Sequence, residues 1–175
     1  MSERIETAVL RDFSVSLCRA AGLSADDAAL LTDSILFAEC RGVTSHGLLR
    51  LPQYIARLRS GATASNVPMP FTMESGGTAR LDAQNGLGQL AGRKASDKAE
   101  ELAAKYGVSF VAVANSNHFG TGAWYAIPAA RRGFFAFNIS SAASAMAPVS
   151  SRARNFFFFM FFPPIIGFLR SRDAV

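Results

Sequence analysis

The chain contains two histidines, His46 and His118, and each lies in a loop rich in glycine, serine and asparagine. A rigid scaffold can aim side chains in such loops at a ligand. Because an imidazole titrates close to neutral pH, either histidine can donate or accept a proton while a carbonyl and a hydroxyl group interconvert. A lone histidine is more often a satisfied surface or packing residue, but the neighbours of these two favour chemistry.

The loop around His46 reads RGVTSHGLLR over residues 41–50. Its last residue, Arg50, carries a planar guanidinium that can hold a carboxylate through two parallel hydrogen bonds. A histidine for the oxygen and an arginine for the carboxylate are the groups that a 2-oxo or 2-hydroxy acid needs. The adjacent Ser45 raises the alternative of acyl transfer. Adjacent residues rarely face each other productively, however, and the chain has no GxSxG motif, so we do not expect a hydrolase.

The loop around His118 reads NSNHFGTG over residues 115–122 and follows a run of β-favouring residues. A strand that ends in a small polar loop and opens a helix is a common ligand site, because the first N–H groups of the helix point at it. The GxG of residues 120–122, like that of residues 86–88, falls short of a full GxGxxG, so each is a weak signal. Two histidines and two cysteines, mutually distant, predict no metal site.

Helices and strands that can position these loops are visible in the pattern of apolar residues and in the turn chemistry. We expect helices over residues 4–21, 24–40, 51–61, 89–106 and from about 121 to 130, with Ser24 as an N-cap and Gly107 as a C-cap. We expect strands over residues 71–74, 78–82, 108–114 and 134–139. The order strand, helix, strand with short connections predicts a mixed α/β fold.

Composition excludes several classes of protein. The chain has 175 residues, is 50% hydrophobic and has a net charge of +5, of which +3 (four Arg against one Asp) falls in residues 151–175. The remaining 150 residues are nearly balanced, so we expect no nucleic-acid partner. The apolar run over residues 156–169 is too short to span a bilayer and contains two prolines. With no signal peptide visible at the start, we expect a cytoplasmic protein without a membrane partner.

Three separated motifs carry a resemblance to a known family. They are RGVxSHGxxRLPxY at residues 41–54, LDxxNGxGQ at residues 81–89 and NSNHFGxxxxY at residues 115–125. In order and spacing, the chain resembles the second, non-Rossmann type of malate/L-lactate dehydrogenase over about residues 5–150. That family includes ureidoglycolate and sulfolactate dehydrogenases, diketogulonate reductase and cyclic-ketimine reductases.

The resemblance implies hydride transfer between NAD or NADP and C2 of a small 2-hydroxy or 2-oxo acid such as malate or lactate, in a homodimer. It assigns His46 as the acid/base, Arg50 as the clamp for the substrate carboxylate and Ser45 as a hydrogen-bonding partner. The second histidine, His118, lies by the nicotinamide in the family and is the proton acceptor in some members, so the assignment of the acid/base stays open. The implied cofactor-binding residues are His118, Asn117, Gly120, Ser140 and Ser141, although the family often has Asn at the last position.

The chain also departs from the family, whose members are much longer. We expect residues 1–66 to form a helical, substrate-side segment and residues 67–150 a partial α/β cofactor-binding region. The Phe-rich residues 151–175 are expected to be an aberrant tail without native structure, the alternative being a hydrophobic strand in a core. The function expected is therefore that of an oxidoreductase fragment. Its alternatives are a catalytically inactive remnant and, less favoured, a nucleic-acid or membrane-surface binder that relies on the tail.

Overall fold

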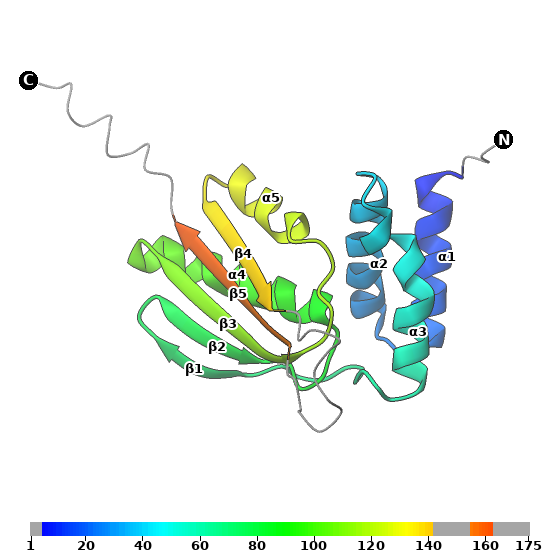
Figure 1. Cartoon of the computed structure of the whole chain (residues 1–175), viewed down its shortest axis with the longest axis horizontal. Helices are drawn as coiled ribbons and strands as arrows, with labels where there is room; N and C mark the ends of the chain where they lie inside the picture. The colour runs from blue at the N-terminus through cyan, green and yellow to red at the C-terminus, as the bar shows by residue number, and fades with distance from the viewer. Residues whose placement is uncertain (1–4, 142–154, 163–175) are drawn as a thin grey trace, which may run out of the picture.

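The computed structural model describes residues 5–141 and 155–162. It places a group of N-terminal helices beside a five-stranded mixed sheet that carries helices on one face (Figure 1). The mixed α/β class expected from the sequence is confirmed. Leu87, which precedes the central helix of the α/β part, packs into the core of the N-terminal helices. The two parts thus share a core, and the expected division at residues 66 and 67 stays a prediction.

The N-terminal part is built from three helices joined by short turns. Its elements are α1 (Thr7–Ala20), α2 (Ala25–Glu39), the short 3-10 helices η1 (Thr44–His46) and η2 (Leu48–Arg50), and α3 (Leu51–Arg59). Ser24 caps α2 as predicted, because its Oγ accepts a hydrogen bond of 3.1 Å from the Asp27 amide. Arg11 of α1 donates two hydrogen bonds, of 2.6 and 3.0 Å, to Asp33 of α2. These contacts fix the helix pair on which the His46 loop rests.

The α/β part alternates strands and helices. Its elements are β1 (Phe71–Ser75), β2 (Thr78–Asp82), α4 (Gly88–Tyr106), β3 (Ser109–Ser116), α5 (Ala123–Arg131), β4 (Phe135–Ser141) and β5 (Asn155–Phe162). The strand order is β1-β2-β3-β5-β4, in which β2 and β3 are parallel and the other neighbours antiparallel. The predicted C-cap of α4 is confirmed, because Gly107 has φ of 83°, in the left-handed region.

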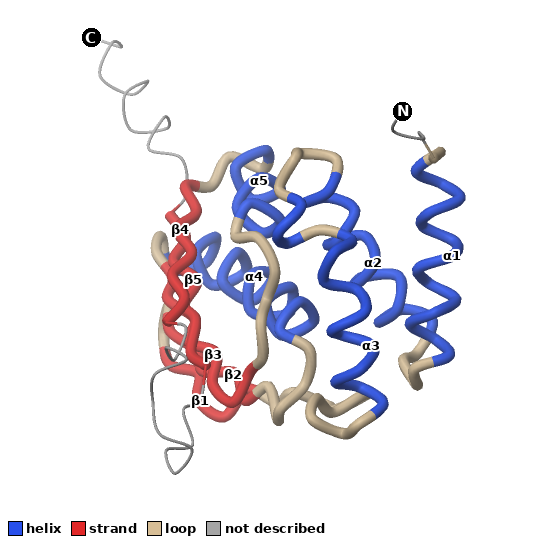
Figure 2. The backbone as a smooth tube through the Cα atoms, turned by 45° about the vertical axis from the view of Figure 1, so that its right-hand side comes forward, coloured by secondary structure: helices blue, strands red, loops and turns tan. Residues whose placement is uncertain are grey.

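Helices α4 and α5 both lie against the face of the sheet that is turned toward the N-terminal helices (Figure 2). Small residues along α4 let it approach the sheet closely, and the strands contribute larger side chains to the same core. The buried members of this core include Ala91, Ala95, Ala99, Leu102, Leu81, Val111, Val113, Phe159 and Phe161. In the described residues the opposite face of the sheet has no helix, and on β4 it exposes Phe135, Phe137 and Ile139.

The expectation of an aberrant tail is corrected for residues 155–162, which form β5 between β3 and β4. Phe159 and Phe161 are 0% exposed. Because side chains alternate between the two faces of a strand, these two residues point together into the core under α4 and α5. The alternative reading, a hydrophobic strand in a core, describes this segment. The rest of the expected tail, residues 151–154 and 163–175, lies outside the described residues.

Two further expectations bear on partners. No helix in residues 5–141 is long and apolar enough to cross a membrane. Within the part of the chain that the structure describes, no group of three His, Cys, Asp or Glu side chains is placed to hold a metal ion.

Candidate active site

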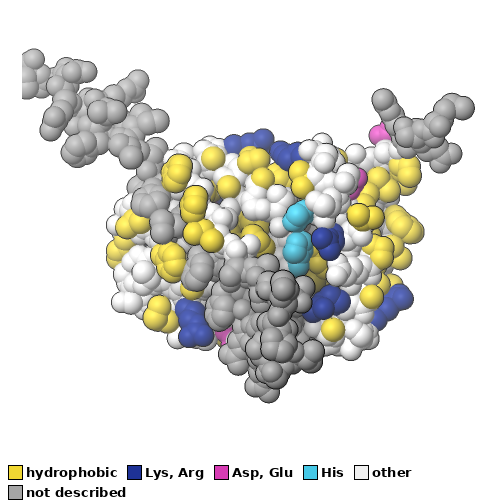
Figure 3. Space-filling model, in the orientation of Figure 1, with side chains coloured by type: hydrophobic (Ala, Val, Ile, Leu, Met, Phe, Trp, Pro, Cys, Tyr) yellow, Lys and Arg dark blue, Asp and Glu magenta, His cyan; other side chains and the backbone are white. Residues whose placement is uncertain are grey.

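Both histidines predicted to act lie together on one surface of the molecule (Figure 3). The ring centroids of His46 and His118 are 5.2 Å apart, with an angle of 34° between the ring planes. His46 ends η1 and His118 lies in the loop between β3 and α5, so the pair joins the two parts of the fold. The Tyr54 hydroxyl, from α3, lies 2.6 Å from His118 Nδ1.

The loop that carries His46 packs against α2. The Glu39 carboxylate accepts a hydrogen bond of 2.8 Å from the Leu48 amide. Gly47 passes so close to this carboxylate that a Cβ at this position would clash with it. The glycine in the SHG motif, which lies between η1 and η2, therefore permits a close approach between the loop and the Glu39 side chain of α2.

Arg50 folds back over the same turn. Its Nε donates a hydrogen bond of 2.7 Å to the Ser45 carbonyl, and its Nη1 donates one of 3.0 Å to Gln53 Oε1. Two of its nitrogens thus hold the guanidinium in place. The positive charges of Arg50 and His46 both lower the pKa of His118. The structure therefore brings Arg50 and both histidines to one site, and the roles expected for them stay a prediction.

Ser45 and His46 face each other, which differs from the expectation that adjacent residues do not. Ser45 Oγ lies 3.0 Å from His46 Nδ1. A serine nucleophile normally needs a base that a third group orients. Among the described residues no carboxylate is hydrogen-bonded to this imidazole. The contact fixes the ring of His46 and leaves its Nε2 for a ligand, so it does not favour a hydrolase.

The His118 loop lies directly on the first turn of α4. A Cβ on Gly88 would clash with the carbonyl oxygens of Asn117 and His118. In the sequence, the NGxG segment stood out only as an incomplete GxGxxG and as part of the LDxxNGxGQ motif, and its second glycine has this additional, long-range role. The α4 N-terminus and the His118 loop can pack backbone against backbone because no side chain separates them.

Asn117 ties this loop to two other segments. Its Nδ2 donates hydrogen bonds of 2.9 Å to the carbonyls of Asn85 and Gly86. Its Oδ1 accepts one of 2.9 Å from Arg57 Nη2 of α3. Both ends of the amide are thus used inside the protein, where they position His118. That Asn117 also binds a cofactor stays a prediction.

The other residues expected on the cofactor side lie farther along the chain. Gly120 has φ of 79°, in the left-handed region that glycine favours, and it turns the loop toward α5. Ser140 is exposed on β4, and Ser141 ends that strand with its side chain outside the described part. Asn138, on the same strand, donates a hydrogen bond of 2.9 Å to the Gly122 carbonyl and so joins β4 to the loop.

Electrostatics favour a neutral His118. Partial burial, followed by the positive charges of His46 and Arg50, lowers the pKa of His118 to about 4. His118 is nevertheless exposed as a residue. Water therefore screens part of this effect, and the downward direction of the shift is what the chemistry uses. Burial raises the pKa of the Tyr54 hydroxyl to about 12, so this neighbour stays protonated at neutral pH.

Tyr54, Arg57 and Gln89 were not predicted as site residues. Tyr54 and Gln89 end two of the quoted motifs, RLPxY and NGxGQ, but nothing in those motifs shows their partners. A usable signal is the spacing of Arg50 and Tyr54, because residues four apart share one face of a helix. The Gln89 side chain is fully buried beside the Tyr54 hydroxyl.

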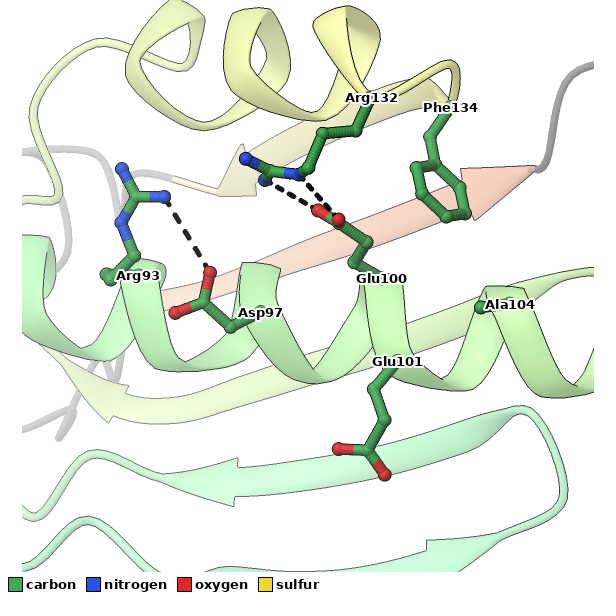
Figure 4. Close-up of a pocket in the computed structure, with 7 residues that line it drawn as sticks. All are labelled: Arg93, Asp97, Glu100, Glu101, Ala104, Arg132 and Phe134. Atoms are coloured by element: carbon green, nitrogen blue, oxygen red, sulfur yellow. Dashed lines mark hydrogen bonds and ion pairs between the residues drawn. The ribbon is translucent and has the colours of Figure 1, made fainter.

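A second charged pocket, of about 380 Å³, lies between α4 and α5 (Figure 4). Its two arginines are paired with carboxylates that line the same pocket. Arg132 donates two hydrogen bonds, of 2.5 and 2.6 Å, to Glu100, and Arg93 lies 3.7 Å from Asp97. This pairing leaves the pocket without the unpaired arginine that carboxylate recognition needs, so we do not assign the substrate to it.

The family model for malate/L-lactate dehydrogenases matches residues 5–156. The chain belongs to this family. It is 34% identical to the malate dehydrogenase of Pyrococcus abyssi over 151 residues, which are 86% of this chain and 42% of that protein. It is also 34% identical to the (2R)-3-sulfolactate dehydrogenase (NADP(+)) of Chromohalobacter salexigens over 148 residues, 85% of this chain and 44% of that protein.

The fold of this family member agrees with a solved structure. It superposes on the malate dehydrogenase of Pyrococcus horikoshii OT3 with a TM-score of 0.79 and 30% sequence identity, covering 85% of this chain and 43% of that one. The resemblance read from the three motifs is therefore confirmed. The chain spans about two fifths of the length of these relatives.

Proposed function

We propose that this chain carries the substrate side of a nicotinamide-dependent oxidoreductase that interconverts a small 2-hydroxy acid and the corresponding 2-oxo acid. Malate, lactate and sulfolactate represent the substrate class. The observation that carries the proposal is the convergence of His46, His118 and the Arg50 guanidinium at one surface. A carboxylate beside a reacting oxygen needs a fixed cation near a proton-exchanging group, and this surface supplies both groups.

Each side chain has a part in this proposal. Arg50 keeps an Nη2 that forms no hydrogen bond to the described residues, so it can still donate to a carboxylate. His46 has its Nδ1 occupied by Ser45 Oγ, which leaves Nε2 to exchange a proton with the substrate oxygen. Ser45 is the hydrogen-bonding partner that positions that ring. His118 stays neutral and adds a second imidazole on the same side of the substrate.

Part of the site fits the amide end of a nicotinamide. Asn138 Oδ1 is buried and has no hydrogen-bond partner among the described residues, beside the loop that opens α5. An unpaired buried acceptor suits an amide donor. We therefore propose Asn138 with His118, Gly120, Ser140 and Ser141 on the cofactor side. NAD or NADP, when bound, supplies or accepts the hydride. A homodimer also remains a proposal that rests on the family.

Binding of the nucleotide tests this function. Purified chain is titrated with NADH and with NADPH while the nicotinamide fluorescence is followed, and then 2-oxo acids are added to look for oxidation of the cofactor. We expect saturable binding of one nucleotide and, in His46→Ala, retained binding without turnover. A wild-type chain that binds neither nucleotide would favour the alternative, a catalytically inactive member of the family.

A further inference from the structure

The contact between Tyr54 and His118 has no part in the roles assigned so far. Tyr54 is 5% exposed and lies on the buried face of α3, one turn beyond Arg50. Its hydroxyl is 2.6 Å from His118 Nδ1, and the two rings are nearly parallel, with 28° between their planes. One turn farther on, Arg57 reaches Asn117 in the same loop. Helix α3 thus grips the His118 loop at two points, and one of them is the imidazole itself.

The direction of the proton in this contact follows from the surroundings. A buried phenol keeps its proton and can donate it to an acceptor, and His118 Nδ1 lies 2.6 Å from the Tyr54 oxygen. Fully buried Gln89 also lies beside this hydroxyl and lowers its pKa, against the larger effect of burial. Neither polar atom of the Gln89 amide makes a hydrogen bond of standard geometry within the described residues. The hydroxyl proton therefore has one well-placed acceptor, His118.

An imidazole that accepts at Nδ1 carries its own proton at Nε2. The charged form, with protons on both nitrogens, is disfavoured because His46 and Arg50 face the same ring. His118 is therefore left with one protonation state and one donor, its Nε2–H, on the side of the ring away from Tyr54. Such a group can donate a hydrogen bond to a carbonyl oxygen but has no lone pair with which to remove a hydroxyl proton.

We infer that Tyr54 is a positioning residue that locks His118 in its Nε2–H tautomer and thereby divides the work between the two histidines. His118 is the fixed hydrogen-bond donor, and His46, whose Nδ1 meets a serine hydroxyl, is the histidine that exchanges protons. The tautomer itself follows from the contact alone. The division of work rests on the proposed function.

Nitrogen NMR on the whole ¹⁵N-labelled chain tests this inference directly, because long-range ¹H–¹⁵N spectra distinguish the two neutral tautomers of each histidine. At pH 7 we expect the Nε2–H pattern for His118 in the wild type. Tyr54→Phe removes only the hydroxyl. We expect it to lower the ratio of Nε2–H to Nδ1–H about fivefold, since one net hydrogen bond is worth on the order of 1 kcal/mol.

Tyr125→Phe is the matched control. Tyr125 is also fully buried, but its hydroxyl donates to the Phe119 carbonyl, in the same loop, and not to a histidine. We expect the control to leave the His118 tautomer unchanged. If Tyr54 acted only by supporting the structure of the loop, the two variants would change the tautomer alike. An equal change in both variants, or a wild-type His118 with its proton on Nδ1, overturns the inference. The second result needs no variant, so it decides even where Tyr54→Phe does not fold.

The outcome is separable from that of the proposed function. If the chain binds no nucleotide but His118 shows the Nε2–H pattern, and Tyr54→Phe weakens that pattern, the proposed function is refuted and the role of Tyr54 is supported. If the chain binds nucleotide and turns over while His118 samples both tautomers equally, the proposed function is supported and the role of Tyr54 is refuted. In an active chain, Tyr54→Phe is expected to lower kcat with less effect on KM.

Discussion

Replacing Gly88 by alanine tests whether the first turn of α4 sets the position of His118. In an ordinary helix this substitution is stabilising by about 0.5–1 kcal/mol, because alanine loses less chain entropy than glycine. Here the added Cβ would overlap the carbonyl oxygens of Asn117 and His118. These are backbone atoms that cannot rotate away, so either the loop or the helix has to move. Overpacking of this kind costs about 1–3 kcal/mol.

Gly122→Ala supplies the control, because Gly122 also lies at the start of a helix and has φ of −59°. A Cβ there would meet Asn138 at 3.7 Å, an ordinary van der Waals distance. The two variants differ in the clash, so we expect Gly88→Ala to be less stable than Gly122→Ala by about 1–3 kcal/mol. For a chain of this size that difference is about 2–12 °C in Tm.

Denaturant unfolding followed by circular dichroism measures the difference in the free energy of unfolding, and thermal unfolding measures the shift in Tm. The same samples give the imidazole NMR spectrum, in which we expect only Gly88→Ala to disturb the contact between Tyr54 and His118. A Gly88→Ala variant as stable as Gly122→Ala, with an unchanged His118 spectrum, would refute the close packing of α4 against the loop.

Three further predictions concern the strand, the clamp and pH. Phe161→Ala, at a fully buried site of β5, is expected to cost about 3–5 kcal/mol of unfolding free energy, whereas the half-exposed Phe137→Ala on β4 costs much less; equal losses in a denaturant titration would contradict the placement of β5. Arg50→Lys should weaken binding of a 2-hydroxy acid about tenfold by calorimetry, because a point charge replaces a two-pronged donor, and unchanged affinity would count against the clamp. Because the pKa of His118 is lowered in the folded chain, its neutral form contributes stability above pH 6.5 that is lost as pH falls toward about 4. His118→Gln should therefore make the free energy of unfolding depend less on pH between about 4 and 6.5. His118 faces His46, Arg50 and Tyr54. If the variant and the wild type lose stability equally over this range, His118 does not titrate with a lowered pKa.

Local signals in the sequence were enough for most elements of the fold. The cap at Ser24 and the left-handed Gly107 each act within one turn of the chain, and each was predicted from neighbouring residues. The Phe-rich strand was misread because an apolar run of one residue type gives no alternation in the sequence. Its alternation exists only in the sheet, where β3 and β4 decide which phenylalanines face the helices.

The sequence was enough to predict which residues form the candidate site, but not which residues hold them in position. His46, Arg50 and His118 stand out by chemistry and by the motifs around them. Tyr54 and Gly88 matter because of partners 64 and about 30 residues away in the chain, and such contacts leave no local pattern. Their roles became visible only when the fold placed α3 and α4 against the loop after β3.

The claim on which the account rests is that His46, His118 and Arg50 form one site for a carboxylate with a neighbouring oxygen. The most direct measurement is the ¹⁵N imidazole spectrum of the whole chain during titration with malate in the presence of NADH or NADPH. We expect both imidazole signals to move with one saturation curve, which shifts to about tenfold higher concentration in Arg50→Lys. Signals that stay fixed at saturating malate, or that move equally in Arg132→Lys at the charged pocket between α4 and α5, would contradict it.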